Sequence, residues 1–118
     1  MTKQRVTEVY RFLSAARMSR LTDEEKIAVI RLLREMKPVV SEIQDAATES
    51  LKKTSEEYPN DMPKAMTLAE QAIADLLNTE TNIDTHILTT DAYERLYFSN
   101  DWTFAQMEEL SDVLVENR

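Results

Sequence analysis

The sequence predicts an all-α protein, and three observations lead to that prediction. The 118-residue chain contains no glycine and only three prolines, whereas sheet-rich folds use glycine in tight turns and bulges. Good helix formers dominate its composition. Apolar residues recur at three- and four-residue steps along most of the chain, which is the spacing of an amphipathic helix. A chain of this length fits a single domain, residues 1–118, which we expect to be a helical bundle built on a long helical hairpin.

The composition excludes several kinds of site. The absence of cysteine rules out disulfides, thiolate zinc sites and iron–sulfur clusters. The absence of glycine rules out Walker and dinucleotide-binding loops and the EF-hand calcium loop. No segment approaches the ~18 apolar residues of a membrane-spanning helix, and residues 1–13 lack the apolar run of a signal peptide. We therefore expect a cytoplasmic protein that does not engage a membrane.

Charge is distributed unevenly along the chain. Residues 1–34 carry eight Lys or Arg against four acids, a net charge of +4. Residues 35–118 carry six against eighteen, a net charge of −12, so that the whole chain has a net charge of −8. This acidic balance repels nucleic acid, and we expect none to bind. The basic third is suited to attract the acidic remainder, in its own chain or in a neighbour.

Residues 1–58 are expected to form a helical hairpin. The first helix is predicted from about Lys3 to Met18. A capping box marks the start of the second, because the Thr22 hydroxyl can accept from the Glu25 amide while the Glu25 carboxylate accepts from the Thr22 amide. The apolar stripe of the second helix consists of Val29, Leu33, Met36, Val40, Ile43 and Ala47.

Pro38 lies within this stripe pattern, where a proline normally breaks or kinks a helix. At about 3.6 residues per turn, however, Pro38 falls on the face opposite the stripe. We therefore predict one long helix from Asp23 to about Glu57, bent at the proline with its convex side toward solvent. Two separate helices that meet near Lys37 are the alternative.

The second half of the chain is predicted to hold three further helices. Pro59 and Pro63, in the segment Tyr58 to Pro63, separate the long helix from a helix over residues 63–78. Its predicted apolar face consists of Met66, Ala69, Ile73, Leu76 and Leu77. Two short helices are predicted within residues 91–118, and a second capping box, formed by Thr103 and Gln106, begins the last one.

Residues 79–90 change character and form an extended segment. Between Thr81 and Thr89, β-branched residues alternate with polar ones, which predicts either one short isolated strand near residues 81–89 or an extended linker. A lone strand needs a partner for its backbone groups. Antiparallel pairing with the same segment of a second copy would supply one and would make the protein a homodimer.

Few residues suggest a catalytic or metal-binding role. His86 is the only histidine, and no serine, cysteine or second histidine is positioned to act with it. Glu42, Asp45 and Glu49 share a helix face but lack the Glu-x-x-His pairs of di-metal bundles, so we interpret them as a solvated surface. We therefore predict no catalytic residue, no metal and no cofactor.

The aromatic residues near the C-terminus have two interpretations. They pack the two short helices together, which we favour because Trp102 and Met107 fit a hydrophobic staple. Alternatively, they contribute to a hot spot for a partner protein, because aromatic residues often carry interface energy. The residues predicted for such a partner-binding surface are Tyr93, Tyr97, Phe98, Trp102, Ile83 and Ile87.

Two short sequence motifs support a resemblance to known proteins. Lys37-Pro38-Val39 follows a Thr-Asp-Glu-Glu-Lys helix start, and Asn100-Asp101-Trp102-Thr103 lies nearer the C-terminus. Through these motifs, residues 9–40 and 90–115 resemble small uncharacterised helical bacterial proteins of phage-derived or mobile-element gene clusters. The resemblance implies a non-enzymatic accessory role, for example in assembly, and it implies no active site.

Three functions follow as hypotheses. We favour a non-enzymatic protein-interaction or assembly-accessory module that binds a partner protein or a second copy of itself. The first alternative is an acidic mimic of DNA that inhibits a nucleic-acid-binding protein, suggested by the net charge of −12 on residues 35–118. The second is a carboxylate-based enzyme, which the missing catalytic constellation disfavours.

Overall fold

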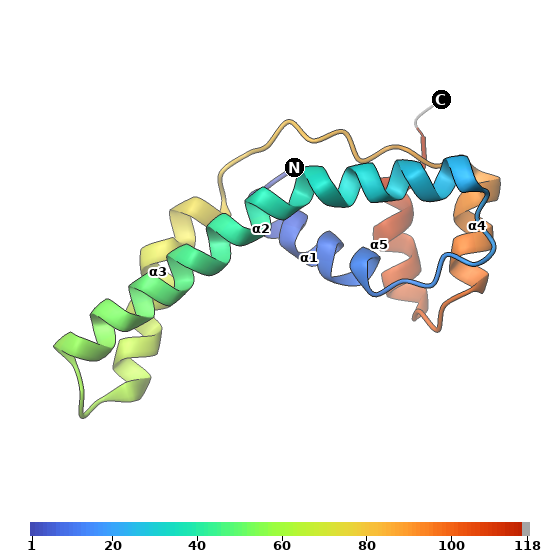
Figure 1. Cartoon of the computed structure of the whole chain (residues 1–118). Coiled ribbons are helices and arrows are strands. Elements are labelled where there is room, and N and C mark those ends of the chain that lie inside the picture. Colours follow the sequence, from blue (N-terminus) through green and yellow to red (C-terminus); the bar gives the residue numbers. More distant parts are fainter. Residues whose placement is uncertain (117–118) are drawn as a thin grey trace.

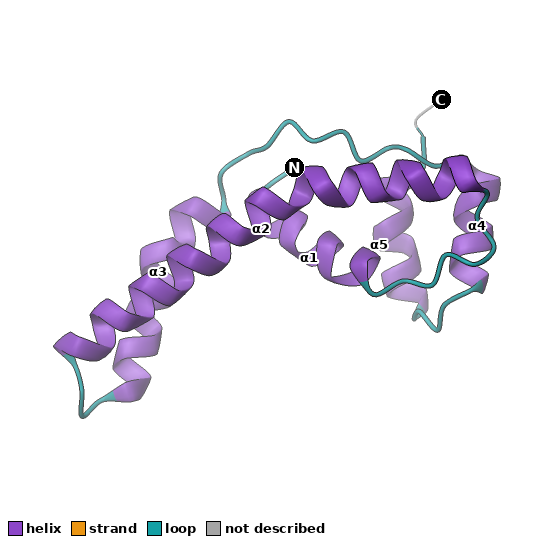
Figure 2. Cartoon of the chain, in the orientation of Figure 1, coloured by secondary structure: helices purple, strands orange, loops and turns teal. Residues whose placement is uncertain are grey.

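The computed structural model describes residues 1–116, and these residues form five helices (Figures 1 and 2). The helices are α1 (Lys3–Ser14), α2 (Asp23–Glu57), α3 (Met62–Leu77), α4 (Thr90–Phe98) and α5 (Phe104–Leu114). The described part of the chain contains no sheet and only two isolated β-bridges. The predicted all-α class is therefore confirmed.

Helix α2 is the longest element, and it runs through Pro38 without a break. The prediction of one helix is confirmed, and the alternative of two helices is wrong. Pro38 is exposed, so the backbone bond lost to the Arg34 carbonyl lies on the solvent side, where water can replace it. Figure 1 shows α2 changing direction part-way along its length. The N-terminal part lies over α1, α4 and α5, and the C-terminal part pairs with α3.

The first group of elements, which we call the head, consists of α1, the N-terminal part of α2, α4 and α5. All four contribute to one hydrophobic core. Its buried members are Val6, Val9, Leu13, Leu21, Val29, Leu32, Met36, Leu88, Ala92, Tyr93, Leu96, Leu110 and Leu114. On α2, Leu32 is a buried member of this core. Leu33, which the sequence placed on the buried stripe, is only half-buried.

Helix α1 ends at Ser14, four residues before the predicted Met18. The reason lies in a contact with the distant end of α4. The Asn100 side-chain amide accepts a hydrogen bond from the Arg17 backbone N–H at 2.8 Å and donates to the Arg17 carbonyl at 3.0 Å. These bonds occupy both backbone groups of Arg17, so this residue is held in the connection to α2 and does not extend α1.

Residues 79–89 form an extended linker that runs back along α2 from α3 to α4 (Figure 1). The predicted alternative of an extended linker is confirmed, because the described residues of this segment form no strand. Isolated bridges fix the two ends, Thr2 with Glu80 and Leu88 with Val115. In between, the buried Thr85 donates its hydroxyl to the Val113 carbonyl at 2.8 Å. Self-pairing of this segment in a dimer stays a prediction.

The C-terminal part of α2 and α3 project from the head as a two-helix hairpin, which we call the arm (residues 41–77; Figure 1). The molecule measures 53 × 28 × 22 Å and has a radius of gyration of 17.2 Å. A compact chain of this length would have a radius of gyration of about 13.5 Å. The arm accounts for the elongation, because none of its side chains belongs to the buried core of the head.

Small residues hold the arm together. The buried side chains of α3 are Ala65 and Ala69, which allow the backbones of the two helices to approach closely. The Thr54 hydroxyl donates to the Ala65 carbonyl at 2.8 Å and fixes the register of the hairpin. Met66, which the sequence placed on the buried face of this helix, is half exposed. Ala69 is buried as predicted, whereas Ala65 occupies the buried position that the sequence assigned to Met66.

The head core generates a first prediction. Met36 is fully buried, so Met36→Ala should lower the free energy of unfolding by about 2–5 kcal/mol through lost burial and a residual cavity. Leu33→Ala should cost roughly half as much or less, because that side chain is only half-buried. Urea unfolding followed by circular dichroism measures both losses. Equal losses would show that the buried face of α2 is assigned incorrectly.

The small interior of the arm generates a second prediction. With few large side chains buried, the arm should open locally at a lower free energy than the head. In hydrogen exchange at low micromolar protein concentration, amides of residues 44–54 and 66–77 should be less protected than amides of residues 27–36. Equal protection would mean that the arm and the head unfold as one cooperative unit.

Candidate functional site

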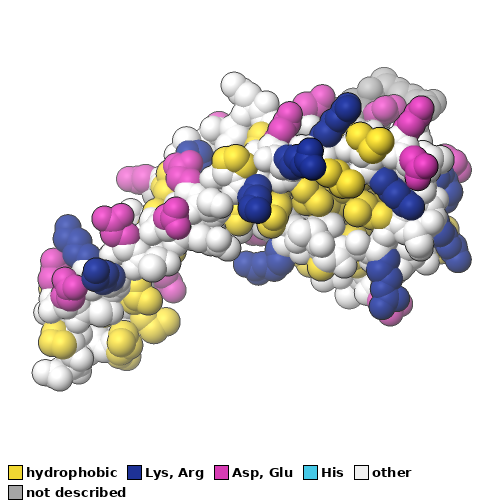
Figure 3. Space-filling view, in the orientation of Figure 1, with side chains coloured by type: hydrophobic (Ala, Val, Ile, Leu, Met, Phe, Trp, Pro, Cys, Tyr) yellow, Lys and Arg dark blue, Asp and Glu magenta, His cyan; other side chains and the backbone are white. Residues whose placement is uncertain are grey.

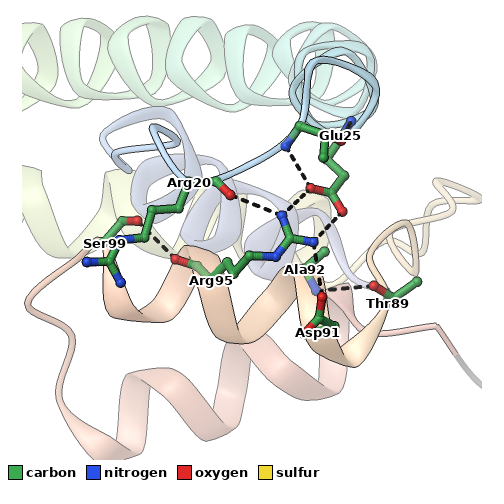
Figure 4. Close-up of polar contacts among 8 residues, drawn as sticks. Arg20, Glu25, Thr89, Asp91, Ala92, Arg95 and Ser99 are labelled. Carbon is green, nitrogen blue, oxygen red and sulfur yellow. Dashed lines mark hydrogen bonds and ion pairs between the residues drawn. The ribbon is translucent and has the colours of Figure 1, made fainter.

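The strongest polar contact of the head joins α2 to α4 (Figure 4). The Arg95 guanidinium donates to both carboxylate oxygens of Glu25, at 2.7 and 2.9 Å, and to the Arg20 carbonyl at 3.0 Å. The same Glu25 carboxylate accepts from the Thr22 amide at 2.8 Å, which completes the predicted capping box. Hydrogen bonds from Arg95, and secondarily from Thr22, lower the pKa of Glu25 to about 2. The pair is fully engaged in joining helices, and it leaves no free group for chemistry.

The aromatic residues of α4 and the following loop serve mainly in packing. Tyr93 is buried, and its hydroxyl donates to the Met107 carbonyl in α5. Burial, followed by the nearby carboxylate of Glu108, raises the pKa of Tyr93 to about 12. The Trp102 ring lies beside it, with the centroids 6.5 Å apart. Tyr93 therefore belongs to the core, and its inclusion in a partner-binding surface is corrected.

The other residues predicted for that surface are not equally exposed. Trp102, Ile83 and Ile87 are partly buried against the core of the head. Tyr97 packs edge-to-face on Phe98 with the ring centroids 5.2 Å apart. Only Phe98, 67% exposed, offers a large free surface. A partner-binding role for these five residues stays a prediction.

His86 has a structural contact on the linker. Its Nδ1 lies 2.9 Å from the Val115 carbonyl, and its backbone N–H donates to the Asp84 carboxylate at 3.1 Å. The contact with Val115 attaches the linker to the end of α5, and the bond to Asp84 lies within the linker. Within residues 1–116, no group of three or more His, Asp or Glu side chains is arranged to hold a metal ion.

The carboxylates on the outer face of α2 are exposed, as the sequence predicted for Glu42, Asp45 and Glu49. Glu42 pairs with Lys3 at 2.8 Å and ties α1 to α2 near the base of the arm. A recess of about 220 Å³ between α1 and α5 contains Arg5, which pairs with Glu8 at 3.2 Å and with Glu109 at 3.5 Å. Its charge is therefore compensated within the protein, which disfavours binding of an anion there.

The arm carries a recess that is lined mostly by apolar side chains. This groove encloses about 160 Å³ and runs between the two helices of the hairpin. It is lined by Ala47, Leu51, Met66, Ala69, Glu70 and Ile73. Met66 is 50% exposed and Leu51 39% exposed, and Met62 at the tip of the arm is 53% exposed. Figure 3 shows hydrophobic side chains gathered on the arm at the lower left of the view.

The apolar spacing of the sequence does not predict this groove, because it places Met66 on the buried face of its helix. Apolar spacing alone fits Met66 as well as it fits Ala65, because Met66 lies three residues and Ala65 four residues before Ala69. The signal that distinguishes the two is the pair of alanines four residues apart, Ala65 and Ala69, since small residues at that spacing favour a close helix–helix contact. Large neighbours such as Met66 are then displaced to the rim.

Comparison with known proteins found no match: no family model, no curated protein and no solved structure is significantly similar to this chain. Across residues 1–116, no helix combines the length and the apolar character needed to cross a bilayer.

The Glu25 contact generates a third prediction. The folded pKa of about 2 lies below the ordinary value of 4.5, so this carboxylate stabilises the fold above pH 4.5, and its contribution is lost as the pH falls toward 2. Glu25→Gln should therefore lower the free energy of unfolding at pH 7, and the difference from the wild type should shrink between pH 4.5 and pH 2.

Urea unfolding at pH 7, 4 and 2.5 measures this difference. Glu24→Gln is the matched control, because Glu24 is the exposed neighbour in the same helical turn and forms no ion pair with any described residue. A difference for Glu25→Gln that is independent of pH would show that the ion pair with Arg95 does not form.

Proposed function

We propose that this chain is a non-enzymatic protein-interaction or assembly-accessory module that binds its partner through the arm. One observation carries the proposal: an apolar groove lies open along a hairpin that projects beyond the core of the protein. Exposed apolar patches on protein surfaces commonly mark contacts with other proteins.

The chemistry of the groove supports protein binding over binding of a small polar ligand. Five of its six lining residues are apolar, and Glu70 is the only charged one. Methionine side chains such as Met66 are flexible and polarizable, and they adapt to the shape of a partner surface. The groove is shallow and open, whereas small-molecule sites usually enclose most of their ligand.

The position of the arm also supports the proposal. Because α2 continues from the head into the arm, the groove is attached to a helix whose other end is fixed by the core and by the Glu25–Arg95 contact. A partner that binds the groove is therefore held at a defined orientation to the head. A flexible linker would not provide that orientation.

The proposal generates a fourth prediction. Met66→Asp places a charge in the groove and should abolish retention of a partner protein when the tagged chain is used to capture proteins from native lysate. Gln71→Asp is the control, because this exposed residue lies on the same helix but does not line the groove.

Circular dichroism verifies that both variants fold. A partner retained by the wild type and by Gln71→Asp, and lost with Met66→Asp, is the expected result. Equal retention by all three proteins would show that binding occurs elsewhere, with the surface around Phe98 as the next candidate.

A further inference from the structure

We propose that the arm binds the arm of a second copy of this chain, so that two hairpins pack face to face as a twofold-symmetric four-helix bundle. This inference rests on the proposed function and names its partner. Three properties of the groove support it: its shape, its charges and its size.

The shape of the groove is complementary to itself. Its floor contains two alanines, Ala47 and Ala69, and the larger side chains of Leu51 and Met66 stand beside them. With Thr54 opposite Ala65, Ile73 is level with residue 46 and Met66 is level with residue 53. In a face-to-face pair about a twofold axis parallel to the arm, Ile73 of each copy therefore lies over Ala47 of the other, and Leu51 of each copy lies between Met66 and Ala69 of the other. Alternation of large and small residues is the arrangement by which packed helices interdigitate.

The second copy also supplies what α3 lacks. A two-helix hairpin can bury only one face of each helix, and its remaining apolar surface needs a further layer. The described contacts of α3 are almost entirely with α2. A second hairpin laid across the groove adds that layer and completes the usual unit of four packed helices.

Two charged residues flank the groove in a pattern that suits twofold symmetry. Lys52 lies on α2 beside Leu51, and Glu70 lies on α3. Both are exposed, and neither forms an ion pair with any other residue between positions 1 and 116.

The register of the hairpin brings these two residues to nearly the same height. The bond between Thr54 and Ala65 places Glu70 opposite residues 49 and 50, so Lys52 lies about 4 Å farther along the arm at ~1.5 Å per residue. A twofold axis parallel to the arm places α2 of each copy over α3 of the other. Lys52 of each copy then faces Glu70 of the other, which gives two equivalent ion pairs across the interface.

The size of the arm predicts the strength of the contact. Helix α3 has 16 residues and is therefore about 24 Å long, and two helices packed ~10 Å apart present a face of roughly 500 Å². The dimer would bury about 1,000 Å² in total, at the lower end of specific interfaces. We therefore expect a reversible dimer whose population depends on concentration in the micromolar range.

Sedimentation of the purified chain between 1 and 300 µM tests the inference. The wild type and the control Gln71→Asp should change from monomer to dimer across this range, and Met66→Asp should remain monomeric. Lys52→Glu and Glu70→Lys should each weaken the dimer by about 2- to 30-fold, since two exposed ion pairs are converted to repulsive contacts. The double variant, Lys52→Glu with Glu70→Lys, should restore the wild-type dissociation constant.

Rescue by the double variant would support the pairing even if a single variant were poorly folded. A wild type that stays monomeric at 300 µM would overturn this inference but not the proposed function, which the capture experiment tests separately. A dimer that is insensitive to Met66→Asp and to both charge reversals would also overturn it. If Ile83→Pro then abolished that dimer, the interface would be the linker segment.

Discussion

The continuity of α2 is the constraint on which the rest of this structure depends. Thirty-five residues, Asp23–Glu57, form one helix, and both halves of the molecule are built on it. The continuity is possible because Pro38 is exposed, so that the missing backbone bond is not buried. A proline on the buried face, at Met36 or Val40 for example, would place the same defect inside the core. The head and the arm would then no longer share a rigid element.

A chain without glycine must also end its helices by other means. No residue of the described chain has a positive φ angle, so the usual left-handed cap is not used. Side chains satisfy the last carbonyls instead. Thr79 donates to the Asp75 carbonyl at 3.0 Å, Ser99 to the Arg95 carbonyl at 2.9 Å, and Asn100 to the Leu96 carbonyl at 2.8 Å. Asn100 extends this role by pairing with the backbone of Arg17, so one helix end also fixes a distant loop.

The sequence predicted those features that depend on local chemistry. Both capping boxes form as expected, at Thr22 and at Thr103, because a cap involves residues only three positions apart. The fold class follows from the helical period, which is repeated along most of the chain. The end of α1 was misplaced because it depends on Asn100, a residue 83 positions from Arg17. No local pattern contains that information.

The binding surface was harder to predict than the fold for the same reason. Whether Met66 lies in the core or on the surface depends on how α3 is rotated against α2, and a hairpin can pack through either alanines or larger residues. In the arm, Ala65 occupies the contact and Thr54 bonds to its carbonyl. A contact made by alanine buries little apolar area, so it stabilises the arm less than a contact made by Met66 would.

The exposure of the larger side chains follows directly from the close approach of the two helices. In the head, large residues such as Leu13, Met36 and Leu96 are fully buried, and this core stabilises the fold. In the arm, the buried side chains of α3 are alanines, and the larger side chains of Leu51 and Met66 line an open groove. An arm that buried Met66 and Leu51 internally would be more stable alone, but it would have no apolar surface to offer a partner. The head therefore provides stability, and the arm, attached to it through α2, can leave its apolar surface available for binding.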